Sequence, residues 1–269
     1  MKLVSSAKLR KAQNAIEAMR PYEEQLLGIL ASLQGGTAGV SSLNLSKNKD
    51  ERKTIVAIAS NSSLCGGFNA NAIAKVRAIR RPGDTVYAIG RKMADAMRKE
   101  GFASPEDFSA LSEHPSYGPA AALVEKLVAD VEAGRTGAVV LVYNHFVSTA
   151  RQEPVVEVLM QRETPDQVGG DRGVEERDSS PAPSYIAPLL EPSRAALLEA
   201  LVPKTRKLKL YAALLDSAAA EHAARTVAMQ TATDNAENLL AELTLQYNKG
   251  RQQKITSEIL DLAGGQAEN

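Results

Sequence analysis

The sequence predicts an α/β domain inserted between two long helices, which pair with each other as an antiparallel coiled coil. Three observations support this prediction. Residues 208–262 contain no proline and have a helix-forming composition throughout. Residues 1–36 repeat apolar side chains at helical spacing. Between the two helices, residues 52–202 alternate short apolar runs with amphipathic segments, an order that is typical of α/β domains.

Residues 1–36 are the predicted N-terminal coiled-coil helix. Its apolar seam steps alternately by three and four residues, which is the heptad pattern of a left-handed coiled coil. The seam consists of Leu9, Ala12, Ile16, Met19, Glu23, Leu26, Leu30 and Leu33. Pro21 lies inside this helix and is expected to bend it, because proline removes one backbone hydrogen bond. Residues 35–49 are rich in Gly, Ser, Asn and Thr and mark a break.

The middle of the chain, residues 52–202, is the predicted α/β domain. Apolar runs of strand length occupy residues 54–59, 85–89, 138–143 and 155–159, and the last two are expected to form a hairpin. Helical patterns occupy residues 69–80, 91–100 and 120–133. Residues 163–183 are polar and turn-rich, which predicts a flexible loop.

Residues 204–269 are the predicted C-terminal coiled-coil helix. Over residues 208–262 it would be about 80 Å long at ~1.5 Å per residue. Its seam consists of Leu208, Tyr211, Leu215, Ala218, His222, Arg225, Met229, Ala232, Ala236, Leu239 and Leu243. We expect this seam to pack against the N-terminal helix as far as Leu243. Beyond it the register slips and polar side chains gather, which favours contact with another protein.

Composition and motifs indicate no catalytic, metal or cofactor site. The 32 basic and 32 acidic residues cancel, so there is no overall attraction to nucleic acid. Cys65 is the only cysteine, and three scattered histidines do not make a metal site. Residues 63–69 follow a predicted strand but match neither phosphate-loop motif, so their paired glycines are interpreted as a tight turn. No apolar run reaches the ~18 residues that a membrane span needs.

Four motifs in this chain resemble the gamma subunits of bacterial F-type ATP synthases. They are residues 1–13 with Arg20-Pro21-Tyr22 after them, residues 64–69, residues 221–236, and residues 247–261. The motifs span the whole chain in the order of that family, and the last two together are highly specific. The resemblance implies the same two-helix coiled coil, with a Rossmann-like domain that holds no nucleotide.

The resemblance also implies a function. The chain would be the rotating central stalk, a non-catalytic subunit that couples proton-driven rotation of the membrane c-ring to the catalytic beta subunits. Its expected partners are the hexamer of alpha and beta subunits, the epsilon subunit and the c-ring. It would lie at the cytoplasmic face of the bacterial inner membrane, as a peripheral protein. The expected contact and coupling residues are Arg225, Arg251, Gln252, Thr256, Glu258, Asp261, Lys2, Lys8, Arg10 and Lys11.

Two questions stay open at the level of sequence. Members of that family normally carry roughly two dozen residues before the position of Met1, about 35 Å of helix at ~1.5 Å per residue. Either the start codon is misassigned or the shaft is partly unpaired. The alternatives for function are a coiled-coil scaffold with an α/β domain that binds no nucleotide, and a stand-alone enzyme acting on a nucleotide or phosphorylated substrate.

Overall fold

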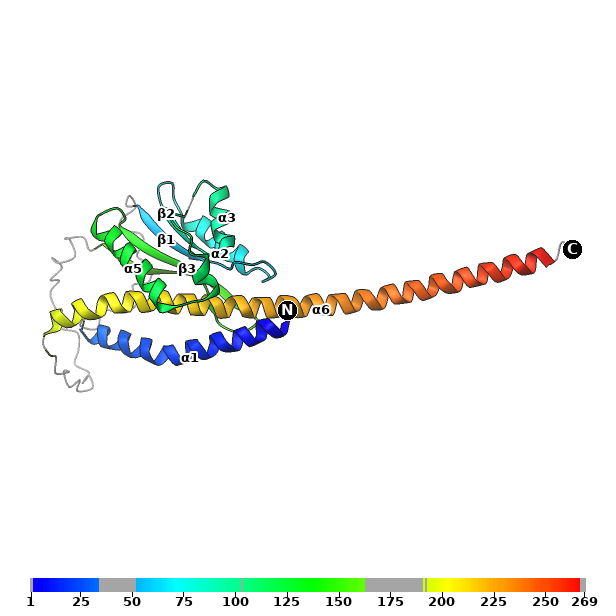
Figure 1. Cartoon of the computed structure of the whole chain (residues 1–269), viewed down its shortest axis with the longest axis horizontal. Coiled ribbons are helices and arrows are strands. Elements are labelled where there is room, and N and C mark those ends of the chain that lie inside the picture. Colours follow the sequence, from blue (N-terminus) through cyan, green and yellow to red (C-terminus); the bar gives the residue numbers. More distant parts are fainter. Residues whose placement is uncertain (1, 34–51, 103, 163–190, 192, 267–269) are drawn as a thin grey trace, which may run out of the picture.

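The computed structural model describes residues 2–33, 52–102, 104–162, 191 and 193–266, with the side chains of the helix up to residue 260. The predicted flexible loop at 163–183 and the predicted break at 35–49 lie outside these residues. The elements are α1 (Lys2–Leu33), β1 (Lys53–Ile58), α2 (Phe68–Ile79), β2 (Thr85–Ile89), α3 (Arg91–Lys99), α4 (Ser109–Glu113), α5 (Tyr117–Glu132), β3 (Ala138–Phe146), β4 (Gln152–Gln161) and α6 (Arg194–Gln266). Figure 1 shows a compact α/β domain beside two long helices, one of which projects far beyond it.

The four strands form one mixed sheet in the order β2-β1-β3-β4. β1 pairs in parallel with both β2 and β3, and β3 pairs antiparallel with β4. The predicted strands and the predicted hairpin are therefore confirmed. Gly90, which links β2 to α3, has φ +101°, and a Cβ there would stand 2.1 Å from the Ala59 carbonyl oxygen. Only glycine fits this close approach of two backbones.

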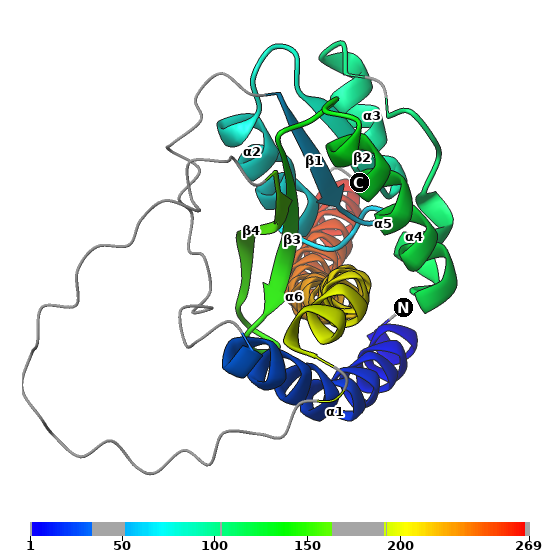
Figure 2. The same ribbon diagram turned by 90° about the vertical axis from the view of Figure 1, so that its left-hand side faces the viewer.

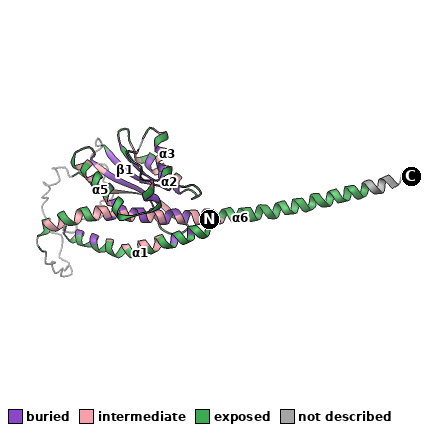
Figure 3. Ribbon diagram, viewed as in Figure 1, coloured by how far each residue is buried: buried purple, intermediate pink, exposed green. Residues whose placement is uncertain are grey.

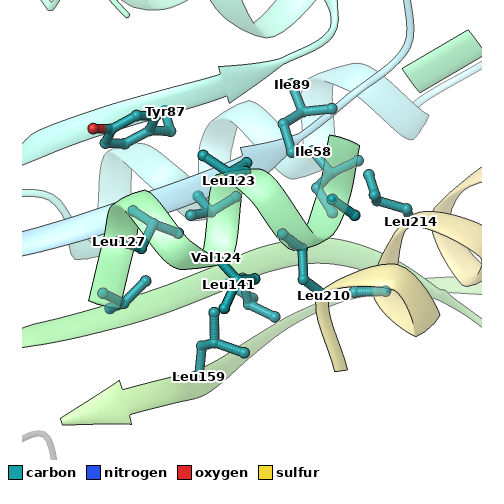
Figure 4. Close-up of a cluster of buried hydrophobic side chains, with 14 of the residues drawn as sticks. Ile58, Tyr87, Ile89, Leu123, Val124, Leu127, Leu141, Leu159, Leu210 and Leu214 are labelled. Atoms are coloured by element: carbon teal, nitrogen blue, oxygen red, sulfur yellow. The ribbon is translucent and has the colours of Figure 1, made fainter. Parts of the chain in front are cut away.

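Helices cover both faces of the sheet because successive side chains of a strand point to opposite sides. Ile55 and Ala57 of β1 pack with side chains of α2 and α3. Val56 and Ile58 point the other way and pack with α5 and α6. Figure 4 shows this second cluster, in which Leu123 and Leu127 of α5 and Leu210 and Leu214 of α6 converge on the strands.

α1 and α6 lie side by side and antiparallel, with α6 between α1 and the sheet (Figure 2). Lys2, at the start of α1, reaches Gln230 of α6, whereas Glu23 faces Lys209 across a shared cavity. Every position of the predicted α1 seam is buried or half-buried, so that part of the prediction is confirmed. α1 continues through Pro21 to Leu33 and is bowed in Figure 1, as a proline inside a helix predicts.

α6 begins earlier than predicted. The C-terminal helix was expected from residue 204, but it starts at Arg194, and Pro203 lies inside it. A proline removes one backbone bond without ending a helix when the flanking turns are held in place. Here Leu208 is buried and Lys207 Nζ lies 2.5 Å from Glu125 Oε1 of α5.

The predicted α6 seam is wrong in register and in length. The residues that face α1 are Ala212, Asp216, Ala219 and Ala223, one position beyond the predicted stripe. The predicted Tyr211 instead meets Tyr117 of α5 edge-on, with ring centroids 5.9 Å apart. The error arises because α6 is covered on two sides, by α1 and by the α/β domain, so its apolar positions belong to two stripes. Pairing also ends near Gln230, where α1 begins, and does not extend to Leu243.

Candidate subunit interface

Among the described residues, the most exposed part is the segment of α6 that continues past the pairing with α1. We call residues 231–260 the projecting segment. Every one of these residues is exposed, and Figure 3 shows the segment as an uninterrupted exposed helix. Along it, Thr231, Thr233, Thr244 and Thr256 each donate a hydroxyl hydrogen bond to the carbonyl four residues earlier. No side chain outside the helix contributes to these bonds.

Large apolar side chains lie on this exposed segment. They are Leu239, Leu240, Leu243, Leu245, Tyr247, Ile255, Ile259 and Leu260, each between 47% and 71% exposed. Leu239, Leu243 and Tyr247 share one side of the helix, because residues four apart are neighbours on a helical surface. An apolar stripe of this kind marks a protein-interaction surface. Nothing in the described part of the chain covers it.

Four of the predicted contact residues lie on the projecting segment: Arg251, Gln252, Thr256 and Glu258. All four are exposed. The Thr256 hydroxyl donates to the Gln252 carbonyl oxygen at 2.8 Å, so its donor is already used within the helix. Asp261 belongs to α6, but its side chain is outside the described part of the structure.

Arg225 lies elsewhere, where α6 still contacts the α/β domain. Its Nη1 donates to Glu221 Oε1 at 2.7 Å and its Nη2 donates to Ser62 Oγ at 2.8 Å. Both side chains of the ion pair are nearly buried, at 12% and 11% exposed. Burial raises the pKa of Glu221, and the charge and hydrogen bond of Arg225 oppose that rise. Arg225 therefore fixes the β1–α2 loop to the last packed turns of α6.

The predicted basic residues of α1 lie near the same junction, on the first three turns of that helix. Lys2, Lys8, Arg10 and Lys11 are all exposed. Lys2 Nζ donates to Gln230 Oε1, next to the start of the projecting segment. The positive charge of Lys8 lowers the pKa values of Glu221 and His222, which places it close to both. The structure thus brings this basic group together with Arg225, and separates it along α6 from residues 251–258.

The loop before α2 confirms the structural interpretation of the paired glycines. Gly66 has φ +55° and Leu64 has φ +67°, so the backbone turns sharply between β1 and α2. Cys65 is 1% exposed, and Asn69 Nδ2 lies 3.1 Å from its sulfur. Asn69 Nδ2 also donates to Ser60 Oγ at 2.8 Å. This network holds in place the loop that presents Ser62 to Arg225.

A polar cavity of about 200 Å³, which was not predicted from the sequence, lies between α1, the β3–β4 hairpin and α6. His145 Nδ1 contacts Asp216, whose other oxygen accepts from the Phe146 backbone N–H at 3.0 Å. Burial raises the pKa values of Asp216 and Glu23, which both line this cavity. The i, i+4 spacing of Glu221 and Arg225 could have been found in the sequence. The His145–Asp216 contact could not, because it joins residues 71 positions apart.

His222 is expected to make the fold sensitive to acid. Burial, and then the charges of Arg225 and Lys8, lower its pKa from 6.5 to about 4. The unfolded chain therefore binds the proton more tightly, so stability is fully present above pH 6.5 and is lost as pH falls toward 4. His222→Gln should remove about 1–2 kcal/mol of this pH dependence, allowing for solvent screening. Urea unfolding at neutral pH and near pH 4.5 measures the difference.

The matched control for this prediction is His114→Gln, because His114 is exposed. It should leave the dependence of unfolding free energy on pH as it is in the unmodified chain. If His222→Gln and the unmodified chain lost the same stability on acidification, the assignment of acid sensitivity to His222 would be wrong.

The comparison with known proteins gives the family. A family model described as ATP synthase matches residues 1–267. The ATP synthase gamma chain of Phocaeicola vulgatus is 44% identical over 272 residues, which cover 98% of this chain and 91% of that protein. The chain belongs to the ATP synthase gamma family. The gamma chain of Pelotomaculum thermopropionicum is 37% identical over 270 residues, with 99% and 91% of the two chains covered.

Solved structures show the same fold at lower identity. A chain of the Euglena gracilis mitochondrial ATP synthase, in a structure of OSCP, F1 and the c-ring, is 20% identical with a TM-score of 0.65 and covers 97% of this chain. A chain of the Tetrahymena thermophila mitochondrial ATP synthase, in a structure of the central stalk and c-ring, is 19% identical with a TM-score of 0.60 and covers 87% of this chain. Among the described helices of this chain, none has the length and apolar character needed to cross a membrane.

Proposed function

We propose that this chain is the central rotary stalk of a proton-translocating ATP synthase. In this role it couples rotation of the membrane c-ring to conformational change in the catalytic beta subunits. The chain is a non-catalytic subunit of the complex. It lies at the cytoplasmic face of the bacterial inner membrane, in contact with the alpha–beta hexamer, the epsilon subunit and the c-ring.

The observation that carries the proposal is the projecting segment, on a chain of the gamma family. All of residues 231–260 are exposed, and a stripe through Leu239, Leu243 and Tyr247 is apolar. Partner subunits that enclose the segment would remove this stripe from water, at about 25 cal/mol for each Å² buried. The helix stands off the α/β domain, so it can enter a ring of subunits while the domain stays outside.

The packed part of α6, beside the sheet and α1, is held in a way that resists twisting. Here α6 is clamped between the sheet and α1, and Arg225 fixes it to the β1–α2 loop through Ser62. A turning force applied to the α/β domain therefore passes to α6 through packed side chains and a nearly buried ion pair. Beyond Gln230, α6 presents different side chains on each side. Such an asymmetric shaft can hold the surrounding catalytic sites in different conformations.

The polar residues take two roles in this proposal. Arg251, Gln252, Thr256 and Glu258, with Asp261, contact the inner surface of the hexamer. Acidic segments of the beta subunits, at the opening of the hexamer where α1 begins, contact four basic residues: Lys2, Lys8, Arg10 and Lys11. Arg225 holds the α/β domain and the shaft together, so its effect on coupling acts through the rigidity of that junction.

Arg251→Ala is expected to weaken coupling without changing the fold. Arg251 is exposed and remote from the sheet, so the thermal unfolding midpoint of the isolated chain should not change. Loss of a charged contact to the hexamer should lower ATP-driven proton pumping in the reconstituted complex at least about tenfold, because a hydrogen bond to a charged group contributes about 1.5–3 kcal/mol. Arg91→Ala, at an exposed position of α3, is the matched control. Unchanged proton pumping by the Arg251→Ala complex would show that Arg251 does not make a contact that coupling needs.

Co-purification separates this proposal from the scaffold alternative. An affinity tag on the α/β domain should bring down the alpha, beta and epsilon subunits with the full chain. A chain that is recovered from its own cells without these subunits would not be a stalk.

A further inference from the structure

A second cavity, of about 220 Å³, lies at the edge of the sheet where β1 and β3 begin and β4 ends. Its lining consists of Arg52, Gly134, Arg135, Thr136, Gly137 and Arg162. Three of the six lining residues are arginines, and none is acidic. The cavity is distinct from the junction at Arg225, and the coupling role uses none of its residues.

The sheet register brings the three arginines together from distant parts of the sequence. Lys53 of β1 pairs with Ala138 of β3, and Ala138 pairs with Gln161 of β4. Arg52, Arg135 and Arg162 stand just outside these paired positions. Gly137 joins the three strands, because its N–H donates to the Arg52 carbonyl at 2.9 Å and its carbonyl accepts from the Arg162 N–H at 2.8 Å.

The turn before β3 positions the side chain of Arg162. Gly134 has φ +70°, a conformation that glycine adopts readily. A Cβ at Gly134 would stand 3.4 Å from Arg162 Nη1, so the guanidinium lies directly against this turn. Thr136 is buried, and its hydroxyl donates to the Arg52 carbonyl at 3.1 Å. The backbone around the cavity is therefore held by three strands and a turn.

The charge of the cavity is only partly balanced. Arg135 donates from Nε and Nη2 to Asp130 Oδ1, at 2.8 and 2.5 Å. Within the described ranges, Arg52 and Arg162 form no ion pair with a carboxylate. Three guanidinium groups and one aspartate leave a net charge of two, which matches a doubly charged anion. Arginine presents paired N–H donors in a fork that fits phosphate oxygens.

The size of the cavity restricts the ligand. Pockets for drug-sized molecules measure about 300–1,000 Å³, which is larger than this one. A phosphate group fits inside, whereas a whole nucleotide would extend beyond the cavity. We propose that Arg52, Arg135 and Arg162 bind a phosphate-type dianion, either a free phosphate species or the phosphate headgroup of a lipid.

The position of the cavity is the reason to consider a lipid. α6 runs in the same direction as β3. Lys209 Nζ donates to the carbonyl of Val158, which pairs with Val140 near the start of β3, whereas Asp216 accepts from the N–H of Phe146 at the end of β3. The projecting segment continues in that direction. The cavity therefore lies at the opposite end of the sheet, which faces the membrane if the chain is a central stalk. Binding of phosphate itself does not depend on that role.

Two binding assays on the purified full chain test the proposal and separate the two sources. Calorimetric titration with inorganic phosphate and pyrophosphate at low salt detects a soluble ligand. Co-sedimentation with phosphatidylcholine vesicles, with and without phosphatidate, detects a headgroup. We expect binding in at least one assay. Arg52→Gln/Arg162→Gln should weaken it at least about tenfold, the loss expected when charge-assisted hydrogen bonds are removed.

Two further variants make the test specific. Arg91→Gln removes one positive charge at the other end of the sheet and should keep full binding. Arg162→Lys keeps the charge but not the fork, and should give intermediate affinity. Thermal unfolding of each variant checks that the exposed arginines were replaced without loss of the fold.

The outcomes are distinct. Binding of phosphate or pyrophosphate assigns a soluble ligand, and binding to phosphatidate vesicles alone assigns a headgroup. No binding in either assay would overturn the proposal. That result is expected if a carboxylate of this same chain occupies the cavity. Equal binding by the double variant and by Arg91→Gln would also overturn it, because the attraction would then be nonspecific.

Discussion

A chain that ends at Thr231 is expected to fold normally and to fail in energy coupling. Residues 232–260 are all exposed, so their removal takes away no buried contact of the α/β domain or of α1. The thermal unfolding midpoint of the sheet and packed helices should therefore stay within about 2–4 °C, the shift that 1 kcal/mol produces in a domain of this size. ATP synthesis by the reconstituted complex should fall at least about tenfold, which corresponds to ~1.4 kcal/mol.

The control for the truncation is a measurement of helix content and thermal stability in the shortened chain. Circular dichroism should show a loss of helix signal in proportion to the residues removed, with an unchanged melting transition for the rest. A chain ending at Thr231 that melted far below the full chain would show that the projecting segment stabilises the domain. Full ATP synthesis by the truncated chain would show that the segment is not needed for coupling.

Leu210→Ala is expected to cause the largest loss of stability of any single change considered. Leu210 is fully buried, and with Leu214 it joins α6 to the core formed by the sheet and α5 (Figure 4). Truncating a buried leucine to alanine costs about 2–5 kcal/mol, because apolar area is lost and a cavity remains. Urea unfolding followed by fluorescence or circular dichroism measures the change.

Leu240→Ala is the matched control, with the same substitution in the same helix. Leu240 is 67% exposed, so its truncation should change the unfolding free energy by less than about 0.5 kcal/mol. Comparable losses from the two substitutions would mean that the two parts of α6 are equally packed in the isolated chain. That result would contradict the division of α6 into a packed part and a projecting segment.

The sequence predicted α1 and the four strands well. The α1 seam was found because α1 packs against the rest of the chain on one side, so its apolar period has a single origin. The strands were found because their apolar runs are short and bounded by turns. The helix α4 was missed because its five residues, Ser109–Glu113, are too short to show a period.

The helix that the sequence predicted poorly is α6, which is covered from two directions by different elements. The α6 stripe was displaced by one residue because Leu210 and Leu214 serve the sheet, whereas Ala219 and Ala223 serve α1. The start of α6 was placed too late: the helix runs through Pro203, and packing of the following turn overrides the low helix propensity of proline.

Some residues of the candidate sites could be predicted from the sequence, and others could not. The contact residues of the projecting segment came from motifs that are continuous in sequence. The partners of Arg225 and the arginine cavity could not be found in this manner. Ser62 lies 163 positions from Arg225, and Arg52 meets Arg162 only through the register of three strands.

Thiol labelling at Leu240→Cys shows whether partner subunits enclose the projecting segment. The native Cys65 is buried, so the introduced thiol dominates the reaction. Lys99→Cys, at an exposed position of α3 on the far side of the sheet from α6, is the reference site. In the isolated chain both thiols should react rapidly. In the assembled ATP synthase, labelling at position 240 should slow at least about tenfold while position 99 stays reactive, because burial removes access to the thiolate. Equal labelling of position 240 in the isolated chain and in the complex would contradict the account.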